Sequence, residues 1–131
     1  MNASPLKVAA VVFPEFELLD LFGPLELLGL LRDRASLSIV AEHADPVASS
    51  QGPKVVVDCP MADVAAVDVL LVPGGWGTRR EVQNEPFLQL LRTLAGRARY
   101  VTSVCTGSAL LARAGLLDGK RATLIRTGSG R

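Results

Sequence analysis

Short apolar runs alternate with amphipathic stretches along this chain, and the alternation restricts the folds open to it. The runs at residues 8–13, 37–41, 67–72 and 100–104 are rich in aliphatic and β-branched side chains and too short for typical helices. Such runs are expected of strands buried on both faces of a parallel sheet. Strands that alternate with amphipathic helices indicate an α/β domain with a mainly parallel sheet.

Helical spacing of three and four marks residues 17–31. The apolar residues of this stripe are Leu18, Leu21, Phe22, Leu25, Leu28 and Leu31. Because proline disfavours the helical region at the residue before it, Gly23-Pro24 predicts a short turn to Phe22 and a main helix that begins at Pro24. Further helices are expected at residues 87–95 and 106–114, the second followed by Gly115 in the C′ position.

The bulk properties exclude several classes of protein. The chain has 131 residues, of which 49% are apolar, and a net charge of +1, which fits one globular domain and offers no basic stripe for nucleic acid. No apolar run is long enough to cross a bilayer, and the N-terminus lacks the pattern of a signal peptide. We therefore expect a cytoplasmic protein that binds neither membrane nor nucleic acid.

Two segments have patterns that differ from the alternation of strands and helices. Residues 46–60 predict a loop and a hairpin, with its turn at residues 51–53. Residues 116–123 predict a turn into a new strand, whereas residues 124–131 are polar, glycine-rich and without periodicity. We expect a domain over residues 1–123, an atypical tail over residues 124–131, and an α/β fold whose C-terminal part is missing.

Cys105 follows the apolar run of residues 100–104 directly, and a helical pattern begins at once after it. This order predicts a sharp strand-to-helix turn that presents the cysteine beside the N–H groups of a helix N-terminus. A helix N-terminus favours anions, and a thiolate there is a strong nucleophile. A buried cysteine that packs under the helix is the alternative.

Thr106 would donate a hydrogen bond to a reacting group or stabilise the helix start.

Three glycines follow the buried run of residues 67–72, in the segment Pro73-Gly74-Gly75-Trp76-Gly77. Glycines permit a close backbone approach, and their N–H groups hold an oxyanion or form a tight connection. The segment lacks the Gly-Lys-Ser/Thr ending of a phosphate-binding P-loop.

Asp20 is an acidic residue in an otherwise apolar stretch. It either caps the helix expected at Pro24 or serves a site, where burial would raise its pKa and suit it to acid–base work.

The remaining thiol and imidazole carry weaker signals. His43 lies in a polar loop and is more typical of the surface than of catalysis, and Cys59 lies between Asp58 and Pro60. The two cysteines form no C-x-x-C pair, so structural zinc is not expected. The two cysteines could be free thiols or could form one disulfide. Free thiols are the expectation for a cytoplasmic protein.

Four segments together resemble the DJ-1/PfpI (ThiJ) superfamily, also called class I glutamine-amidotransferase-like. They are Phe13-Pro14 with Leu19-Asp20-Leu21-Phe22-Gly23-Pro24-Leu25-Glu26, then Leu70-Leu71-Val72-Pro73-Gly74-Gly75, Ser103-Val104-Cys105-Thr106-Gly107-Ser108, and residues 114–123. They follow the family's order and cover the chain to Thr123. The resemblance implies a flavodoxin-like sheet sandwiched by helices, a cysteine on a nucleophile elbow, and a homodimer.

The Cys-Thr-Gly elbow is most similar to the isonitrile hydratase branch. The resemblance implies a Cys105 nucleophile, an Asp20 acidic partner, an adjacent Thr106, and oxyanion- or substrate-binding positions at Gly74, Gly75, Trp76 and Gly107. A thiolate would attack the isonitrile carbon, and water would release an N-substituted formamide, so the enzyme would be a hydro-lyase. No metal or organic cofactor is implied.

Two other readings of the resemblance stay open. The protease-like branch is not one of them, because it has histidine directly after the cysteine, where this chain has Thr106. The same domain is similar to the sensory module of AraC-type transcription regulators, in which the elbow need not be catalytic. A thiol-based redox or stress protein, with Cys105 oxidised, is the third reading.

Overall fold

The computed structural model describes residues 4–116 and the backbone of residues 122–125. Its strands are β1 (Leu6–Val11), β2 (Ala35–Ala41), β3 (Val47–Ala48), β4 (Lys54–Val55), β5 (Cys59–Pro60), β6 (Val69–Val72), β7 (Tyr100–Val104) and β8 (Ala122–Ile125). Its helices are α1 (Leu18–Gly29), α2 (Thr78–Glu81), α3 (Glu85–Arg97) and α4 (Gly107–Arg113), with short 3-10 turns η1 (Arg32–Arg34) and η2 (Met61–Asp63).

The main sheet has six strands in the order β5-β2-β1-β6-β7-β8, and every neighbouring pair is parallel. The chain winds from β1 to β2 on one side and later places β6 on the other side of β1. Ligands of open α/β sheets bind outside the carboxyl ends of the strands at such a reversal. The predicted α/β, flavodoxin-like class is confirmed by this topology.

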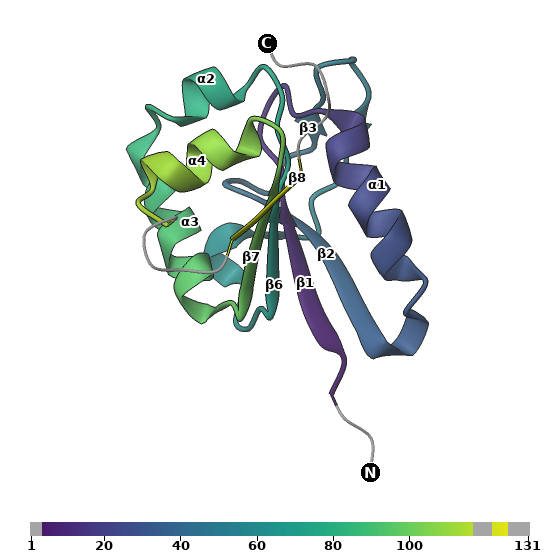
Figure 1. Cartoon of the computed structure of the whole chain (residues 1–131). Coiled ribbons are helices and arrows are strands. Elements are labelled where there is room, and N and C mark those ends of the chain that lie inside the picture. Colours follow the sequence, from purple (N-terminus) through teal and green to yellow (C-terminus); the bar gives the residue numbers. More distant parts are fainter. Residues whose placement is uncertain (1–3, 117–121, 126–131) are drawn as a thin grey trace.

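Helices cover the two faces of the sheet (Figure 1). Helix α1 packs along β2 on one face, and α2, α3 and α4 form the layer on the other. The core between the layers is aliphatic with three fully buried phenylalanines, of which Phe13 and Phe87 meet edge to face at 6.0 Å between ring centroids. The buried runs predicted as strands therefore supply both faces of the core, as a doubly covered parallel sheet requires.

The hairpin predicted within residues 46–60 is present as β3 and β4, which pair antiparallel around a turn that contains Gly52 at φ +109°. It lies against the segment that leads into α1, because Ser49 bridges to Phe16 and the Ser50 N–H donates to the Phe16 carbonyl at 2.8 Å. The hairpin thus fixes the chain between β1 and α1.

The start of α1 differs from the prediction. The sequence predicted a turn to Phe22 and a main helix from Pro24, whereas one helix runs from Leu18 to Gly29 with Pro24 inside it. The restriction that proline imposes on the residue before it is largely a clash with that residue's Cβ, and Gly23 has none. Leu21 is fully buried and anchors the first turn, whereas Phe22 is 43% exposed and lies off the core face.

The C-terminal segment continues the sheet. Strand β8 pairs parallel with β7 and contains the backbone of Leu124 and Ile125, two residues of the expected tail. Residues 117–121 and 126–131 lie outside the described residues, so the division of the chain at residue 123 stays a prediction. Among residues that the structure describes, no helix has the length and apolarity needed to cross a membrane.

Candidate functional site

Cys105 stands on a strained turn between β7, which ends at Val104, and α4, which begins at Gly107. Its φ of +50° lies in the left-handed region, which is costly for a residue with a Cβ. Gly107 makes the turn possible, because a Cβ at this position would overlap the carbonyl oxygens of Val72 and Pro73. The predicted sharp turn is therefore present, and it leaves Cys105 partly exposed.

Asp20 lies in the first turn of α1 and faces the cysteine. The Cys105 thiol donates to the Asp20 Oδ1 at 3.9 Å, and the Gly74 N–H donates to the Asp20 Oδ2 at 3.2 Å. Asp20 as a whole residue is buried, with 6% of its surface exposed. The structure thus brings together one residue from each of three distant segments, at the carboxyl ends of β1, β6 and β7.

Burial raises the pKa of the Asp20 carboxyl above its ordinary value of 3.8. The hydrogen bonds from Gly74 and Cys105 act in the opposite direction, and the charge of Glu17 adds to the rise. Desolvation is the largest of these effects, because it penalises the ionised form of a carboxyl group. A carboxyl group with a raised pKa suits proton transfer closer to neutral pH.

The backbone N–H groups of Gly74 and Gly75 both point at site side chains. The Gly75 N–H donates to the Thr106 Oγ1 at 3.0 Å, while that of Gly74 is held by Asp20. Gly75 has φ +132°, and a Cβ at Gly74 would come within 2.7 Å of the Thr106 Oγ1. Gly74 is therefore required by the close approach of the loop after β6 to the elbow, and Gly75 by its positive φ and by the Glu15 carbonyl, which a Cβ would overlap.

Thr106 does not act as a side-chain cap. It occupies the N-cap position of α4, but its hydroxyl makes no capping hydrogen bond and is engaged with Gly75 instead. The side chain therefore does not stabilise the start of α4 by capping, which was one of the two roles considered for it. The hydroxyl cross-links the elbow to the loop after β6.

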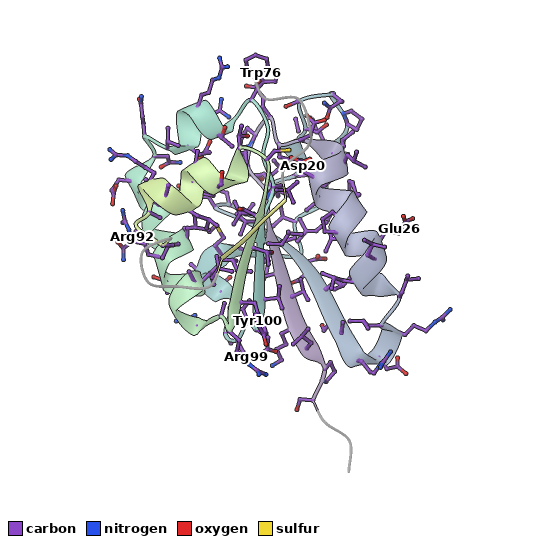
Figure 2. The ribbon with its side chains drawn as sticks, viewed as in Figure 1. Asp20, Glu26, Trp76, Arg92, Arg99 and Tyr100 are labelled. Carbon is purple, nitrogen blue, oxygen red and sulfur yellow. The ribbon has the colours of Figure 1, made fainter. Side chains whose placement is uncertain are left out.

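Trp76 lies on the rim of this region. Its ring is 60% exposed, with the Arg79 guanidinium 4.2 Å from the ring centroid. Figure 2 shows Trp76 at the same end of the molecule as Asp20, beyond the ends of the strands. A cation over one face of the ring restricts the indole and leaves an apolar surface beside Gly75.

The role of one residue near the site, Gln51, was not predicted from the sequence. The Gln51 side chain accepts the Leu18 N–H at 3.3 Å and donates to the Glu17 carboxylate at 3.0 Å. Gln51 therefore caps the first turn of α1, which holds Asp20. No local sequence signal marks this role, because the glutamine reaches α1 from the turn of the β3–β4 hairpin.

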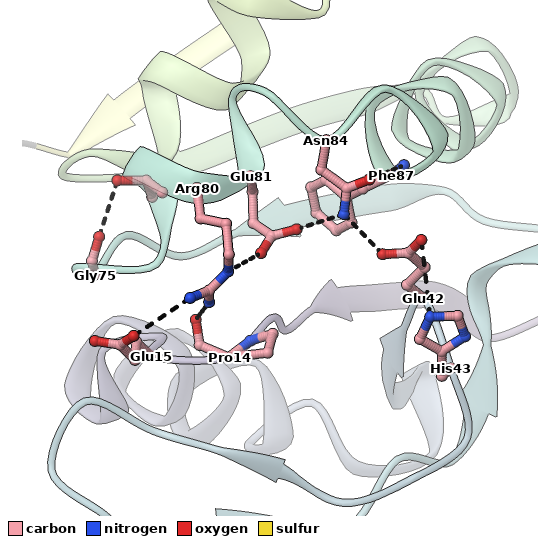
Figure 3. A network of polar contacts seen from close by, with 10 residues as sticks. Pro14, Glu15, Glu42, His43, Gly75, Arg80, Glu81, Asn84 and Phe87 are labelled. Carbon is pink, nitrogen blue, oxygen red and sulfur yellow. Dashed lines mark hydrogen bonds and ion pairs between the residues drawn. The ribbon is translucent and has the colours of Figure 1, made fainter.

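A polar network that the sequence did not reveal ties α2 to the turn after β1 (Figure 3). Arg80 donates to the Glu81 carboxylate at 3.1 Å and to the Pro14 carbonyl at 2.9 Å, and lies 3.4 Å from Glu15. Asn84 donates to Glu81 and Glu42, each at 2.9 Å. The Glu81 side chain is almost completely buried, so its partners on both oxygens are needed to offset desolvation.

This network borders a cavity of about 490 Å³ at the carboxyl ends of β1 and β2. Its walls include Phe13, Val47 and Phe87, and its polar rim includes Glu42 and Arg80. A larger hollow of about 780 Å³ lies at the opposite, amino ends of the strands, beside Lys7, Asp68 and Arg99. Cys105 lines neither hollow.

The other two candidates lie apart from the elbow. His43 is largely exposed and its Nε2 is 3.8 Å from the Glu42 carboxylate, far in sequence and fold from β7. Cys59 begins the edge strand β5 and forms no disulfide with Cys105. Burial raises the pKa of the Cys59 thiol, and the nearby carboxylates of Asp63 and Asp58 raise it further.

Within residues 4–116, no group of three or more histidine, cysteine, aspartate or glutamate side chains is arranged to hold a metal ion.

The chain is similar in sequence to known proteins. The model of the DJ-1/PfpI family matches residues 6–127. The chain is 42% identical over 118 residues to "Isonitrile hydratase" of Pseudomonas putida, a match that covers 90% of this chain and 51% of that protein. It is 32% identical over 123 residues to the "HTH-type transcriptional regulator GbdR" of Pseudomonas aeruginosa, covering 90% of this chain and 33% of the regulator.

A solved structure gives the same picture of the fold. The crystal structure of a ThiJ/PfpI family protein from Pseudomonas syringae superposes with a TM-score of 0.81 at 35% identity. The alignment covers 86% of this chain and 47% of that one. The chain thus spans about half the length of that structure and of the isonitrile hydratase, and a third of the regulator's length.

Proposed function

This chain belongs to the DJ-1/PfpI family, and we propose that its Cys105 elbow hydrates an isonitrile to an N-substituted formamide. The observation that carries the proposal is the position of the Asp20 carboxyl group, 3.9 Å from the Cys105 sulfur. Cys105 itself lies on a strained turn with φ +50°. The 42% identity to a protein named isonitrile hydratase supports this choice of substrate.

The proposed first step is attack of the Cys105 sulfur on the terminal carbon of the isonitrile. A new S–C bond forms, one bond of the C–N triple bond is lost, and the same carbon takes up a proton. The product is a thioimidate, S–CH=N–R, bound to Cys105. The thiol proton passes by way of Asp20, which accepts a hydrogen bond from Cys105.

Water then completes the reaction. The oxygen of the water bonds to the thioimidate carbon, one of its protons goes to the nitrogen, and the other goes to Asp20, which returns it to the Cys105 sulfur after that sulfur leaves. The S–C bond breaks to release R–NH–CHO and the Cys105 thiolate, so one isonitrile and one water give one formamide. We assign Asp20 the transfer of these protons, because its raised pKa allows it to carry a proton and release it again.

The amides and Thr106 position these groups in the proposed mechanism. Gly74 holds one oxygen of Asp20, which leaves the other directed at the sulfur. The Thr106 hydroxyl, now on the Gly75 N–H, is placed to exchange this partner for the oxygen that develops on the intermediate. Gly107 permits the elbow, and Trp76 offers an apolar surface for the substituent R.

The test is turnover of an alkyl and an aryl isonitrile by the chain, followed by proton NMR of the formamide product. We expect product with the wild-type chain and with Cys59→Ser, and none with Cys105→Ser. Asp20→Asn should lower the rate by about a hundredfold or more, in the range of a lost general acid–base group. Turnover that survives Cys105→Ser would contradict the proposal.

A ligand-sensing role is the second candidate, because GbdR is a transcriptional regulator and aligns with 90% of this chain. In that role Cys105 would turn nothing over. A folded chain that binds the isonitrile without forming product would favour sensing. Selective oxidation of Cys105 to the sulfinic acid by dilute peroxide, without turnover, would favour the redox role.

A further inference from the structure

The cavity of about 490 Å³ at the carboxyl ends of β1 and β2 has the size and the lining of a small-molecule site. Its walls include the buried apolar side chains of Phe13, Val47 and Phe87. His43 lies at the rim and is largely exposed, so the cavity opens to solvent on that side. No residue of the Cys105 elbow lines the cavity, which is therefore a separate site.

Two carboxylates meet at one wall of this cavity. The Asn84 Nδ2 donates to the Glu42 Oε1 and to the Glu81 Oε1, each at 2.9 Å, so these two oxygens lie side by side (Figure 3). The Glu81 side chain is 4% exposed and that of Glu42 is 24% exposed. Asp45 adds a third carboxylate to the lining, against the single guanidinium of Arg80. The lining is therefore anionic, even with a protonated imidazole at the rim, and its charges act more strongly where water is excluded.

The hydrogen-bond donors of this wall are already engaged. Both hydrogens of the Asn84 Nδ2 go to carboxylates. All three nitrogens of the Arg80 guanidinium donate within the chain: Nε to Glu81, one terminal nitrogen to the Pro14 carbonyl, and the other to the Glu15 carboxylate at 3.4 Å. The wall therefore has little to offer an anion, which needs donors directed at it.

The acceptors of the same wall are only partly used. A carboxylate offers about four acceptor positions, and the described residues fill one of them on Glu42 and two on Glu81. The Glu42 Oε2 accepts no hydrogen bond from these residues, since the His43 Nε2 lies 3.8 Å away. A carboxylate taken out of water is stabilised by donors and by positive charge. The unfilled positions therefore favour a ligand that brings both.

We propose that this cavity binds a small organic cation. An ammonium or amidinium group of the ligand donates to the carboxylates of Glu42 and Glu81, and its apolar body packs on Phe13, Val47 and Phe87. The two phenylalanine rings, which meet edge to face at 6.0 Å, suit an aryl body, because aromatic rings attract one another in such arrangements.

The test uses three probes of nearly the same shape and different charge: benzamidinium, neutral benzamide and anionic benzoate. Each is titrated into the isotope-labelled full chain up to about 10 mM, above the dissociation constants of weak small ligands, and amide shifts are followed by NMR. Benzamidinium should shift the amides of residues 41–48 and 80–87 until they saturate. The dissociation constants of benzamide and benzoate should be at least about tenfold higher, because neither satisfies the two carboxylates.

Glu42→Gln removes one charge from the cavity and keeps the shape of the side chain. It should raise the dissociation constant of benzamidinium by about tenfold, as for the loss of one charge-assisted hydrogen bond. Glu26→Gln is the matched control, because it removes the same charge from an exposed position on α1 outside the cavity. This variant should bind benzamidinium as the wild-type chain does.

Each outcome decides the proposal. Absence of saturable shifts with benzamidinium, or binding of benzamide or benzoate that is equally tight, would overturn it. Shifts centred on Gly74, Gly75 and Thr106 would place the probe at the elbow and would also overturn it, as would equal effects of Glu42→Gln and Glu26→Gln. The NMR spectrum of each variant without probe reports whether its fold is retained, and the comparison of the three probes on the wild-type chain depends on no variant.

Discussion

The chain carries two cysteines beside parallel strands, and their surroundings differ in almost every respect. Cys59 opens the edge strand β5, between Asp58 and Pro60, and is followed by a 3-10 turn. Cys105 comes directly after β7, which lies between β6 and β8 in the sheet. It has φ +50°, and α4 begins two residues later at Gly107. Burial, and after it the nearby carboxylates, raise the pKa of the Cys59 thiol, whereas a single carboxyl group accepts a hydrogen bond from Cys105.

The difference shows that two residues of the same type have quite different environments in this fold. Three glycines, one buried aspartate and one threonine surround Cys105, and each comes from a segment that the sheet brings to the same edge. Cys59 has no such convergence, since β5 pairs only with β2. The elbow is thus a tertiary feature that can be broken at positions other than the cysteine.

The largest effect should come from Gly107→Ala. Its Cβ would overlap the Val72 and Pro73 carbonyl oxygens, which are backbone atoms and cannot rotate away. We expect the free energy of unfolding to fall by about 3 kcal/mol, at the upper end of overpacking effects. Urea denaturation followed by circular dichroism measures the change.

Gly96→Ala is the matched control for this substitution. Gly96 lies in α3 with open space around its Cβ position, so alanine should raise the free energy of unfolding by about 0.5–1 kcal/mol. Equal effects of the two substitutions would show that the elbow tolerates a Cβ, and that its backbone is less closely packed than we describe.

Alkylation should separate the two thiols directly. At neutral pH we expect iodoacetamide to modify Cys105 at least about tenfold faster than Cys59, because burial and the acidic neighbours of Cys59 raise the pKa of its thiol and so disfavour the reactive thiolate. Peptide mass spectrometry of time points reports both sites in one sample. In urea the two rates should converge, and faster modification of Cys59 in the folded chain would reverse the comparison.

The pH dependence of stability should depend on Asp20. Because burial raises the pKa of this carboxyl group, the folded chain binds the proton more tightly than the unfolded chain does. The stabilisation is present below the ordinary value of 3.8 and is lost as the pH rises through the higher folded value. Asp20→Asn should therefore flatten the decrease in stability over that window, as measured by urea denaturation at a series of pH values. Unchanged pH dependence in this variant would mean that Asp20 does not titrate abnormally.

Much of the sheet and of the region around Cys105 could be predicted from the sequence. The features that were not predicted have physical explanations. The apolar runs identified the strands, and the residue order identified Cys105, Gly74 and Gly75, because buried parallel strands and tight turns have strong local signals. The helix start at Leu18 was missed because packing of Leu21 and the absence of a Cβ on Gly23 outweigh the proline signal.

Contacts between distant segments account for the remaining misses. Gln51 reaches α1 from a hairpin 33 residues away in the chain, and Arg80 reaches the Pro14 carbonyl over 66 residues. No periodicity or capping pattern records such contacts, because they depend on how the segments pack after the sheet has formed. The buried carboxylate of Glu81 belongs to the same class, since its sequence neighbours are arginines and suggest a solvated surface.

The smallest effect tests the hydroxyl that joins the elbow to the loop after β6. Thr106→Val keeps the shape of the side chain but removes the acceptor of the Gly75 N–H, a bond of 3.0 Å. We expect a loss of about 1 kcal/mol, typical of one hydrogen bond near the surface, and a local increase of about fivefold in the exchange rate of the Gly75 amide. Hydrogen exchange by NMR measures it, and Thr106→Ser, which retains the hydroxyl, should leave the rate close to that of the wild type. Amides of β5 beside Cys59 should not change in either variant. If Thr106→Val raised the exchange rates of the Gly75 amide and of the β5 amides equally, the hydrogen bond would stabilise the whole fold. Thr106 would then not be a specific support of the Cys105 elbow.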